Sequence, residues 1–205
     1  MKTQVIDLSQ QDAIQRALDQ IHSGGIIAFP TDTVYGLGSS PFNPEAIKRL
    51  FTAKGRNFNK AIAILIGDIS QLPLLSEEFN PTAQILSRQF WPGALTLILN
   101  KKKELPAILS PFPSIGIRMP DHPFALNLLR VTGPLAVTSA NLSGGKNPLT
   151  AKDVLEQLDG RVDLLMDGGQ CPGGVPSTVV DCTSPNIKFI RVGAIAIETI
   201  KKALP

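Results

Sequence analysis

The sequence of 205 residues contains few aromatic residues, histidines and cysteines. Aromatic residues make up 5% of it, which argues against an RNA-binding module that stacks bases on aromatic side chains. His22 and His122 are the two histidines, and neither follows a pattern that pairs it with a serine or cysteine nucleophile. Cys171 and Cys182 lack the close paired spacing of a metal site, so two reduced thiols are expected. The composition therefore predicts neither a catalytic triad nor a metal centre.

Long apolar runs are also missing. The longest, AIAILI and ALTLIL, fall far short of the ~20 residues that cross a bilayer, and the N-terminus carries no apolar segment typical of a secretory signal. We therefore expect a cytoplasmic protein with no membrane contact. The length suits one domain of ~100–200 residues. A net charge of +3 predicts nothing if it is spread over the surface, but gathered in one groove it would attract a nucleotide or RNA.

Strand-like and helix-like patterns alternate along the chain. Short apolar runs rich in branched residues predict strands at 25–29, 61–66, 94–99, 114–119, 135–139, 162–166, 177–182 and 188–192. Helical spacing with capping residues predicts helices from Ser9 to Gly24, Asn43 to Gly55 and Asn80 to Phe90, and over 122–131, 151–158 and 195–203. This alternation predicts an α/β domain with a largely buried mixed sheet. Ligands bind beyond strand ends in open α/β sheets, so chemistry is expected in loops 30–43, 54–60, 100–113, 139–149 and 167–176.

Two polar segments of these loops have both a structural and a functional interpretation. FPTDTVYGLG, residues 29–38, begins where a predicted strand ends. Its side chains suit either a turn that satisfies its own backbone or a ligand-binding loop, and its ten residues favour the loop. Lys54-Gly55-Arg56 places two cations at the end of a predicted helix. The helix dipole stabilises such cations by ~0.3–1 kcal/mol each, but the pair also suits a polyphosphate or a carboxylate.

Two further polar segments follow strands. The segment 138–147 offers small hydroxyl and amide side chains that either fill a connection or contact a phosphate or an amine. Its glycine spacing, and Asn147 in place of Ser or Thr, exclude a Walker loop. The glycine-rich segment 168–179 either cradles an anion with its backbone amides or forms a mobile surface loop. Arg118 and Arg191, taken alone, are best interpreted as solvated charges or partners of surface carboxylates.

Six motifs together resemble one known family. FPTDTVYGLG, Lys54-Gly55-Arg56, FWPGALTLIL, IGIRMPDHP, TSANLSGG and GGVPSTVVD occur here in the order typical of the YrdC/Sua5 family, the threonylcarbamoyl-AMP synthases. The resemblance covers about residues 10–193. It implies a twisted mixed α/β sheet with helices around it and a large positively charged groove. Longer members carry a second, C-terminal domain through a linker. With 205 residues the chain resembles the short form, so we expect one domain over 1–205.

The resemblance also implies a reaction. Family members combine L-threonine, bicarbonate and ATP into threonylcarbamoyl-AMP and pyrophosphate, with Mg2+ as the expected metal ion. The product serves the t6A modification of tRNA, which implies a handover to the threonylcarbamoyl transferase complex. A second hypothesis is a module of the same fold that binds tRNA or double-stranded RNA without synthase activity.

Site residues follow from their positions in the matching motifs. For L-threonine the resemblance implies Thr33, Ser177 and Arg118, with Arg118 as the partner of the carboxylate. Lys54 and Arg56 are implied as catalytic and ATP-binding cations, and Tyr35 as a residue that shapes the pocket. The remaining implied ATP contacts are Ser114, Ser139, Asn141, Asn147 and Arg191.

Two positions depart from the longer family members. Lys60 stands where these often carry asparagine, and Leu65 where they carry a histidine near the threonine site. The spelling KGR-x-x-x-K resembles other short members, so we interpret both as variation between subtypes. The departure at Leu65 bears on the details of the threonine pocket.

Overall fold

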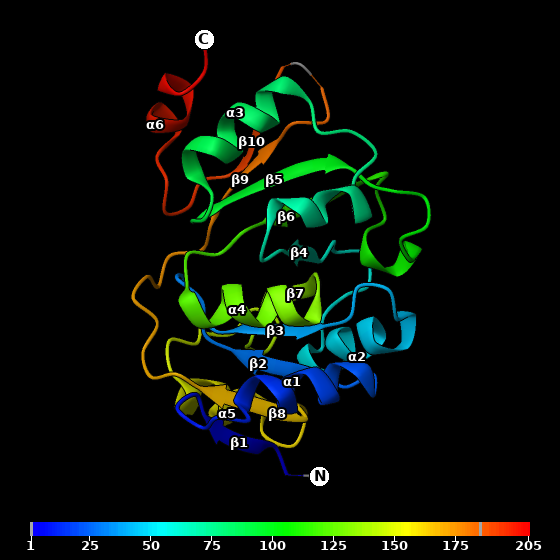
Figure 1. Cartoon of the computed structure of the whole chain (residues 1–205), viewed down its shortest axis with the longest axis vertical. Helices are drawn as coiled ribbons and strands as arrows, with labels where there is room; N and C mark the ends of the chain where they lie inside the picture. Colours follow the sequence, from blue (N-terminus) through cyan, green and yellow to red (C-terminus); the bar gives the residue numbers. More distant parts are fainter. Residues whose placement is uncertain (1, 185) are drawn as a thin grey trace.

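The computed structural model describes residues 2–184 and 186–205, and in this part of the chain ten strands form one sheet (Figure 1). Their order is β1-β8-β2-β3-β7-β4-β6-β5-β9-β10, with both parallel and antiparallel neighbours. The predicted α/β fold with a mixed sheet is therefore confirmed. The strands are Gln4–Asp7 (β1), Ile27–Phe29 (β2), Gly36–Ser39 (β3), Ala63–Leu65 (β4), Leu95–Asn100 (β5), Ser114–Arg118 (β6), Leu135–Ser139 (β7), Leu164–Asp167 (β8), Thr178–Asp181 (β9) and Lys188–Arg191 (β10).

Each predicted helix is present, with shifts at the ends. The helices are Ala13–His22 (α1), Pro44–Lys54 (α2), Pro81–Phe90 (α3), Pro123–Thr132 (α4), Ala151–Leu158 (α5) and Ile197–Lys202 (α6), with short 3-10 turns at Ile69–Leu74 (η1) and Ala107–Leu109 (η2). Asn43 caps α2 as predicted, because its side chain accepts hydrogen bonds from the backbone N–H groups of Glu45 and Ala46. No helix among the described residues is long and apolar enough to cross a membrane.

The start of α1 corrects one prediction. The helix begins at Ala13 rather than after Ser9, and its N-cap, Asp12, makes no capping hydrogen bond through its side chain. The backbone N–H of Ser9 instead donates to Asp7 Oδ1, which forms a turn after β1. Ser9 therefore belongs to the strand-to-helix connection, because the side chain of Asp7 closes a turn with the backbone N–H two residues on.

Two strands, β1 and β3, were not predicted from the sequence. β3 lies inside the segment predicted as a loop, since its Gly-Leu-Gly-Ser sequence has low strand propensity. It nevertheless pairs with β2 on one side and β7 on the other. A Cβ atom on Gly36 would come within 2.8 Å of Val137 Cγ1, so close packing requires glycine at this position. Tertiary packing, rather than propensity, makes this segment a strand.

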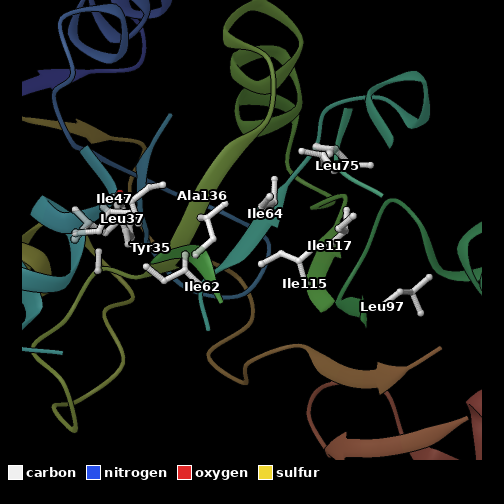
Figure 2. Close-up of a cluster of buried hydrophobic side chains, with 14 of the residues drawn as sticks. Tyr35, Leu37, Ile47, Ile62, Ile64, Leu75, Leu97, Ile115, Ile117 and Ala136 are labelled. Carbon is white, nitrogen blue, oxygen red and sulfur yellow. The ribbon is translucent and has the colours of Figure 1, made fainter. Parts of the chain in front are cut away.

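Two hydrophobic clusters cover the two faces of the sheet. On one face, Ile27 and Phe29 of β2 pack with α1 and α4. Ala28 between them points to the other face, into a larger cluster with α2, α3 and α5. Figure 2 shows part of this larger cluster, including Tyr35 and Ile64. The sheet is therefore buried on both sides over much of its area, as predicted.

Candidate functional site

A cavity of about 370 Å³ opens over the middle of the sheet. Part of its wall is formed by alternate residues of strands in the sheet, such as Ala63 and Leu65 of β4 and Thr96 and Ile98 of β5, two strands that flank β6. Alternate residues of a strand point to the same side, so the cavity lies on one face of the sheet. Several polar residues of the wall nevertheless lie in the predicted loops, among them Thr33, Arg56 and Asn147. The loops contribute only part of the wall.

Small side chains keep this part of the sheet open. Ala63 and Gly116 lie side by side on β4 and β6, where larger residues would fill the cavity. A Cβ atom on Gly116 would lie 3.0 Å from Thr96 Cγ2 and 3.6 Å from the Ala63 side chain. The small residues on the neighbouring strands β4 and β6 therefore keep the cavity open.

The charge of the cavity wall has one sign. Three arginines line it, Arg56 from the loop after α2, Arg118 from β6 and Arg191 from β10. Within residues 2–184 and 186–205, no aspartate or glutamate takes part in the lining. The large positively charged groove that the resemblance implies stays a prediction, but the arginines make the cavity suited to an anionic ligand.

Arg118 is held from three directions. Its Nε donates to the carbonyl of Gly93, its Nη1 to Thr33 Oγ1 at 3.0 Å, and its Nη2 to the carboxylate of Asp32. Burial lowers the pKa of Arg118, while the adjacent Asp32 acts in the opposite direction. Because a guanidinium carries five N–H groups, two stay available for a ligand after these three contacts within the described structure. Thr33 and Arg118, which the resemblance groups together, are thus in direct contact.

The hydroxyl group of Thr33 lies between Thr31 and Arg118. Thr31 Oγ1 donates its proton to the carbonyl of Val34 at 2.7 Å and accepts from the backbone N–H groups of Thr33 and Val34. These two N–H groups occupy both lone pairs of Thr31 Oγ1, so its 3.1 Å contact with Thr33 Oγ1 does not fix the Thr33 proton. Thr33 Oγ1 accepts from Arg118, which leaves its proton and one lone pair for a ligand.

Arg191 and Ser177 form a second polar group in the cavity wall. Arg191 donates from Nε and Nη2 to the carbonyl of Ser177, and from Nη2 to Ser177 Oγ at 3.1 Å. Ser177 Oγ also lies 2.8 Å from Thr96 Oγ1 of β5. Thr96 was not predicted from the sequence, although a single polar residue inside the apolar run ALTLIL was a usable signal.

Lys54 lies behind the cavity wall rather than in it. Its side chain is buried, with the whole residue 2% exposed, and Nζ donates to the carbonyls of Ser139 and Asn141 and to Asn141 Oδ1. Burial and the nearby charge of Arg56 lower the pKa of Lys54 to about 7, whereas its three oxygen partners favour the ammonium form.

The residues implied by the family motifs divide into two groups by position. Seven contribute to the wall of the cavity: Thr33, Arg56, Arg118, Ser139, Asn147, Ser177 and Arg191. Lys54, Ser114 and Asn141 do not; Ser114 starts β6, opposite Asn100 of β5. The implied role of Lys54, Ser114 and Asn141 in contacting ATP stays a prediction.

Tyr35 joins the segment FPTDTVYGLG to the glycine-rich segment 168–179. Its ring is buried, its Oη donates to the carbonyl of Gly169, and the backbone N–H of Gly168 donates to Oη. Burial raises the pKa of Tyr35 to about 12, so it stays protonated at neutral pH. The backbone N–H of Gly174 also donates to the carbonyl of Thr33. Tyr35 therefore shapes the site from behind, by fixing the glycine-rich loop.

The donor set does not fit an Mg2+ ion held by the protein. Mg2+ prefers carboxylate oxygens and water in an octahedral arrangement. The described part of the chain has no group of three or more His, Cys, Asp or Glu side chains that could hold a metal ion. The cavity wall presents arginines instead. We therefore assign no metal-dependent step to these residues.

A sequence profile of the Sua5/YciO/YrdC family, described as "Telomere recombination", matches residues 19–193. The chain belongs to the Sua5/YciO/YrdC family. It is 42% identical to a Bacillus subtilis protein named threonylcarbamoyl-AMP synthase, over 97% of this chain and 58% of the relative. A Mycobacterium tuberculosis protein named putative threonylcarbamoyl-AMP synthase is 36% identical, over 93% of this chain and 88% of the relative.

A solved structure of the Sua5/YciO/YrdC family agrees with the fold. Pyrococcus abyssi Sua5, solved in complex with L-threonine, matches with a TM-score of 0.94 and 36% identity, over 100% of this chain and 61% of that chain. The chain thus spans less than two thirds of the length of both the B. subtilis relative and P. abyssi Sua5. Of the two positions that depart from longer family members, Leu65 lines the cavity and Lys60 is exposed.

Proposed function

We propose that this chain is an L-threonylcarbamoyladenylate synthase, which converts L-threonine, bicarbonate and ATP to threonylcarbamoyl-AMP and pyrophosphate. The observation that carries the proposal is the cavity lined by three arginines, with no carboxylate among its described lining residues. Its charge suits two anionic substrates, a nucleotide and an amino acid, bound side by side. The names of relatives at 36–42% identity and the threonine complex of P. abyssi Sua5 support these substrates.

In this proposal the arginines divide the two substrates between them. Arg118 binds the threonine carboxylate with its remaining N–H groups, since guanidinium and carboxylate match in geometry. Thr33 accepts a hydrogen bond from the amine or hydroxyl of threonine, and Ser177 lies on the same side. Arg56 and Arg191 face the phosphates of ATP. The Nε of Arg56 is buried and has no acceptor within the described residues, which a phosphate oxygen would supply.

The chemistry requires positioning rather than a protein nucleophile. The threonine amine attacks the carbon of bicarbonate or CO2, forms the C–N bond and loses a proton, and water leaves when the reactant is bicarbonate. A carbamate oxygen then attacks the α-phosphorus of ATP, and the bond to the β-phosphate breaks as pyrophosphate departs with its electron pair. Holding the two anions together and neutralising their charge is what the arginines contribute. Mg2+ in this proposal belongs to the ATP substrate as its phosphate-bound counterion.

Pyrophosphate release tests the proposal. With the purified chain and ATP, release should require L-threonine and bicarbonate together. Arg56→Ala and Arg118→Ala should each lower the rate by at least about tenfold, because each removes a charge-assisted hydrogen bond of ~1.5–3 kcal/mol. Arg88→Ala is the matched control, because Arg88 is an exposed arginine on α3. Release that is indifferent to threonine would contradict the proposal.

The remaining parts of the proposal concern partners and location. The product would pass to the threonylcarbamoyl transferase complex for t6A modification of tRNA, which suggests a cytoplasmic enzyme close to its ATP and tRNA pools. We further propose that residues 1–205 act as one domain, supported by a sheet that runs from β1 to β10. A cavity of about 370 Å³ favours small substrates over an RNA duplex. Tight, salt-sensitive binding of double-stranded RNA without any response to ATP would favour the RNA-binding alternative instead.

A further inference from the structure

We propose that Lys54 is a positioning residue, which holds the segment 139–143 so that the Ser139 hydroxyl accepts a hydrogen bond from a ligand amine or hydroxyl instead of donating to phosphate. The proposal deepens the synthase function and rests on it for the identity of the ligands. It assigns Lys54 and Ser139 roles that differ from direct phosphate binding.

Lys54 uses all three N–H donors of its ammonium group within the protein. An ammonium group has three N–H donors. Three oxygens of the same segment receive them, namely the carbonyls of Ser139 and Asn141 and the side-chain Oδ1 of Asn141. The backbone carbonyl of Lys54 also accepts from the N–H of Ser143 at 2.9 Å. Lys54 thus joins the end of α2 to the segment after β7 and has no donor left for a phosphate.

The side-chain amide of Asn141 sets the direction of the Ser139 hydroxyl proton. Its Nδ2 donates to the carbonyl of Gly145 at 2.8 Å, which fixes the orientation of the amide. Oδ1 therefore faces both Lys54 Nζ, at 3.1 Å, and Ser139 Oγ, at 2.6 Å. An amide oxygen only accepts, so the hydroxyl proton of Ser139 points at Asn141 and away from the cavity. Ser139 lines the cavity, and with its proton on Asn141 it has lone pairs left for a ligand.

A phosphate and an amine or hydroxyl group would interact differently with Ser139. A phosphate oxygen only accepts, so it would have to break the bond from Ser139 to Asn141 to gain a donor. An amine or hydroxyl group of a ligand can donate to Ser139 without breaking any contact. Ser139 therefore accepts from ligand N–H and O–H groups, whereas the arginines of the wall donate to anions.

Tripolyphosphate, which carries no adenosine, isolates the phosphate contacts. We expect Arg56→Ala to weaken its binding by at least about tenfold in calorimetry, as for the loss of a charged hydrogen bond. Lys54→Met and Ser139→Ala should stay within about twofold of their controls, Lys48→Met and Ser143→Ala. Lys48 is an exposed lysine on the same helix, and Ser143 is an exposed serine in the same segment. A loss for Lys54→Met as large as that for Arg56→Ala would overturn the proposal.

L-Threonine and adenosine, titrated separately, identify the ligand that donates to Ser139. Ser139→Ala and Lys54→Met should weaken the same one of the two, by about 3–10-fold, as expected for a neutral hydrogen bond of ~0.5–1.5 kcal/mol. Because Lys54 acts through Ser139, the double variant should bind about as weakly as the weaker single variant. A loss for threonine assigns the amine or hydroxyl of the amino acid, and a loss for adenosine assigns the nucleoside. No loss for either ligand would overturn the proposal.

An NMR measurement on the unsubstituted chain removes any dependence on the folding of variants. With 15N-labelled lysine, the Lys54 ammonium should give a slowly exchanging N–H signal, assigned by its absence from Lys54→Met. Tripolyphosphate should leave the shift of this signal unchanged, and a large shift would overturn the proposal. If the wild-type chain binds neither threonine nor ATP, the synthase function fails, while this signal still tests the contacts of Lys54.

Discussion

Asp32 determines how much of the charge of Arg118 is available to a ligand. Its carboxylate accepts from Arg118 Nη2, and both side chains are largely buried, at 13% and 8% exposure. Removing one partner of a buried ion pair costs more than forming the pair stabilises, because the other charge stays buried without compensation. Asp32 thus neutralises part of the charge of Arg118 and orients its guanidinium.

Replacement of Asp32 should separate stability from affinity. In Asp32→Asn the amide oxygen can still accept from Arg118, but the negative charge is gone. We expect the melting temperature of the free protein to fall, by an amount equivalent to ~1–3 kcal/mol, because the arginine is left partly uncompensated. The rise in melting temperature on adding L-threonine should become larger, since its carboxylate then supplies the missing charge.

Asp121→Asn is the control for this experiment, because Asp121 is exposed and lies just after β6. A smaller shift with threonine in Asp32→Asn than in the control would contradict the role assigned to Asp32. Thermal melts with and without threonine are sufficient for the comparison.

The strands β4 and β6 divide their residues between core and cavity. Ile64 and Ile117 are fully buried in the larger cluster, while Ala63, Leu65, Gly116 and Arg118 line the cavity. This division follows from the two-residue period of a strand. It also means that neighbouring residues of one strand have different effects when they are changed.

Substitutions at Ala63 and Ile64 should affect different properties. Ala63→Leu fills cavity space, so we expect binding of ATP and threonine to be lost while the unfolding free energy changes by less than about 1.5 kcal/mol. Ile64→Ala leaves a hole in the core, so the unfolding free energy should fall by about 2–5 kcal/mol. Ligand affinity at low temperature should persist in Ile64→Ala. Urea unfolding and calorimetry of both variants provide the test. Equal losses of ligand affinity in Ala63→Leu and Ile64→Ala would contradict the assignment of Ala63 to the cavity and Ile64 to the core.

Caps and apolar periods made most elements predictable from the sequence. The asparagine caps of α2 and α3 were predicted correctly because these interactions lie within four residues of chain. β3 was missed because its glycines carry no strand signal and its pairing partners lie elsewhere in the sequence. Local interactions are visible in a sequence, whereas pairing across long separations is not.

The pH dependence of stability is a property of the whole molecule to which Lys54 contributes. Burial and the charge of Arg56 lower its pKa from 10.5 to about 7 in the folded state. Between these two values the unfolded chain binds more protons than the folded chain, so the contribution of Lys54 to the unfolding free energy rises with pH. Below about pH 7 the lysine is charged in both states, and the contribution becomes constant.

Comparison with Lys54→Met isolates this contribution. The difference in unfolding free energy, wild type minus Lys54→Met, should increase from about pH 7 to about pH 10 and be flat from pH 5 to 6.5. Urea unfolding at a series of pH values measures it, and Lys48→Met should show no such trend because Lys48 is exposed. A difference that decreases with rising pH would contradict a lowered pKa of Lys54.

The sequence by itself determined the fold class and the family. Apolar runs, helix caps and six motifs in order are local features, and each is readable without coordinates. The same motifs grouped Thr33, Arg118 and Ser177, and the structure has all three in the wall of one cavity.

Tertiary structure alone decided where the cavity lies and how its polar groups are oriented. Thr33 and Arg118 are 85 positions apart, as are Lys54 and Ser139, so their contacts depend on strand order and register rather than on neighbouring residues. A motif names the residue types, but it cannot say which of them face the ligand. The fold brings Lys54 to the carbonyl of Ser139, behind the cavity wall. The direction of a hydroxyl proton depends on the acceptor that the fold brings to it, and for this reason Ser139 is assigned as an acceptor toward the ligand.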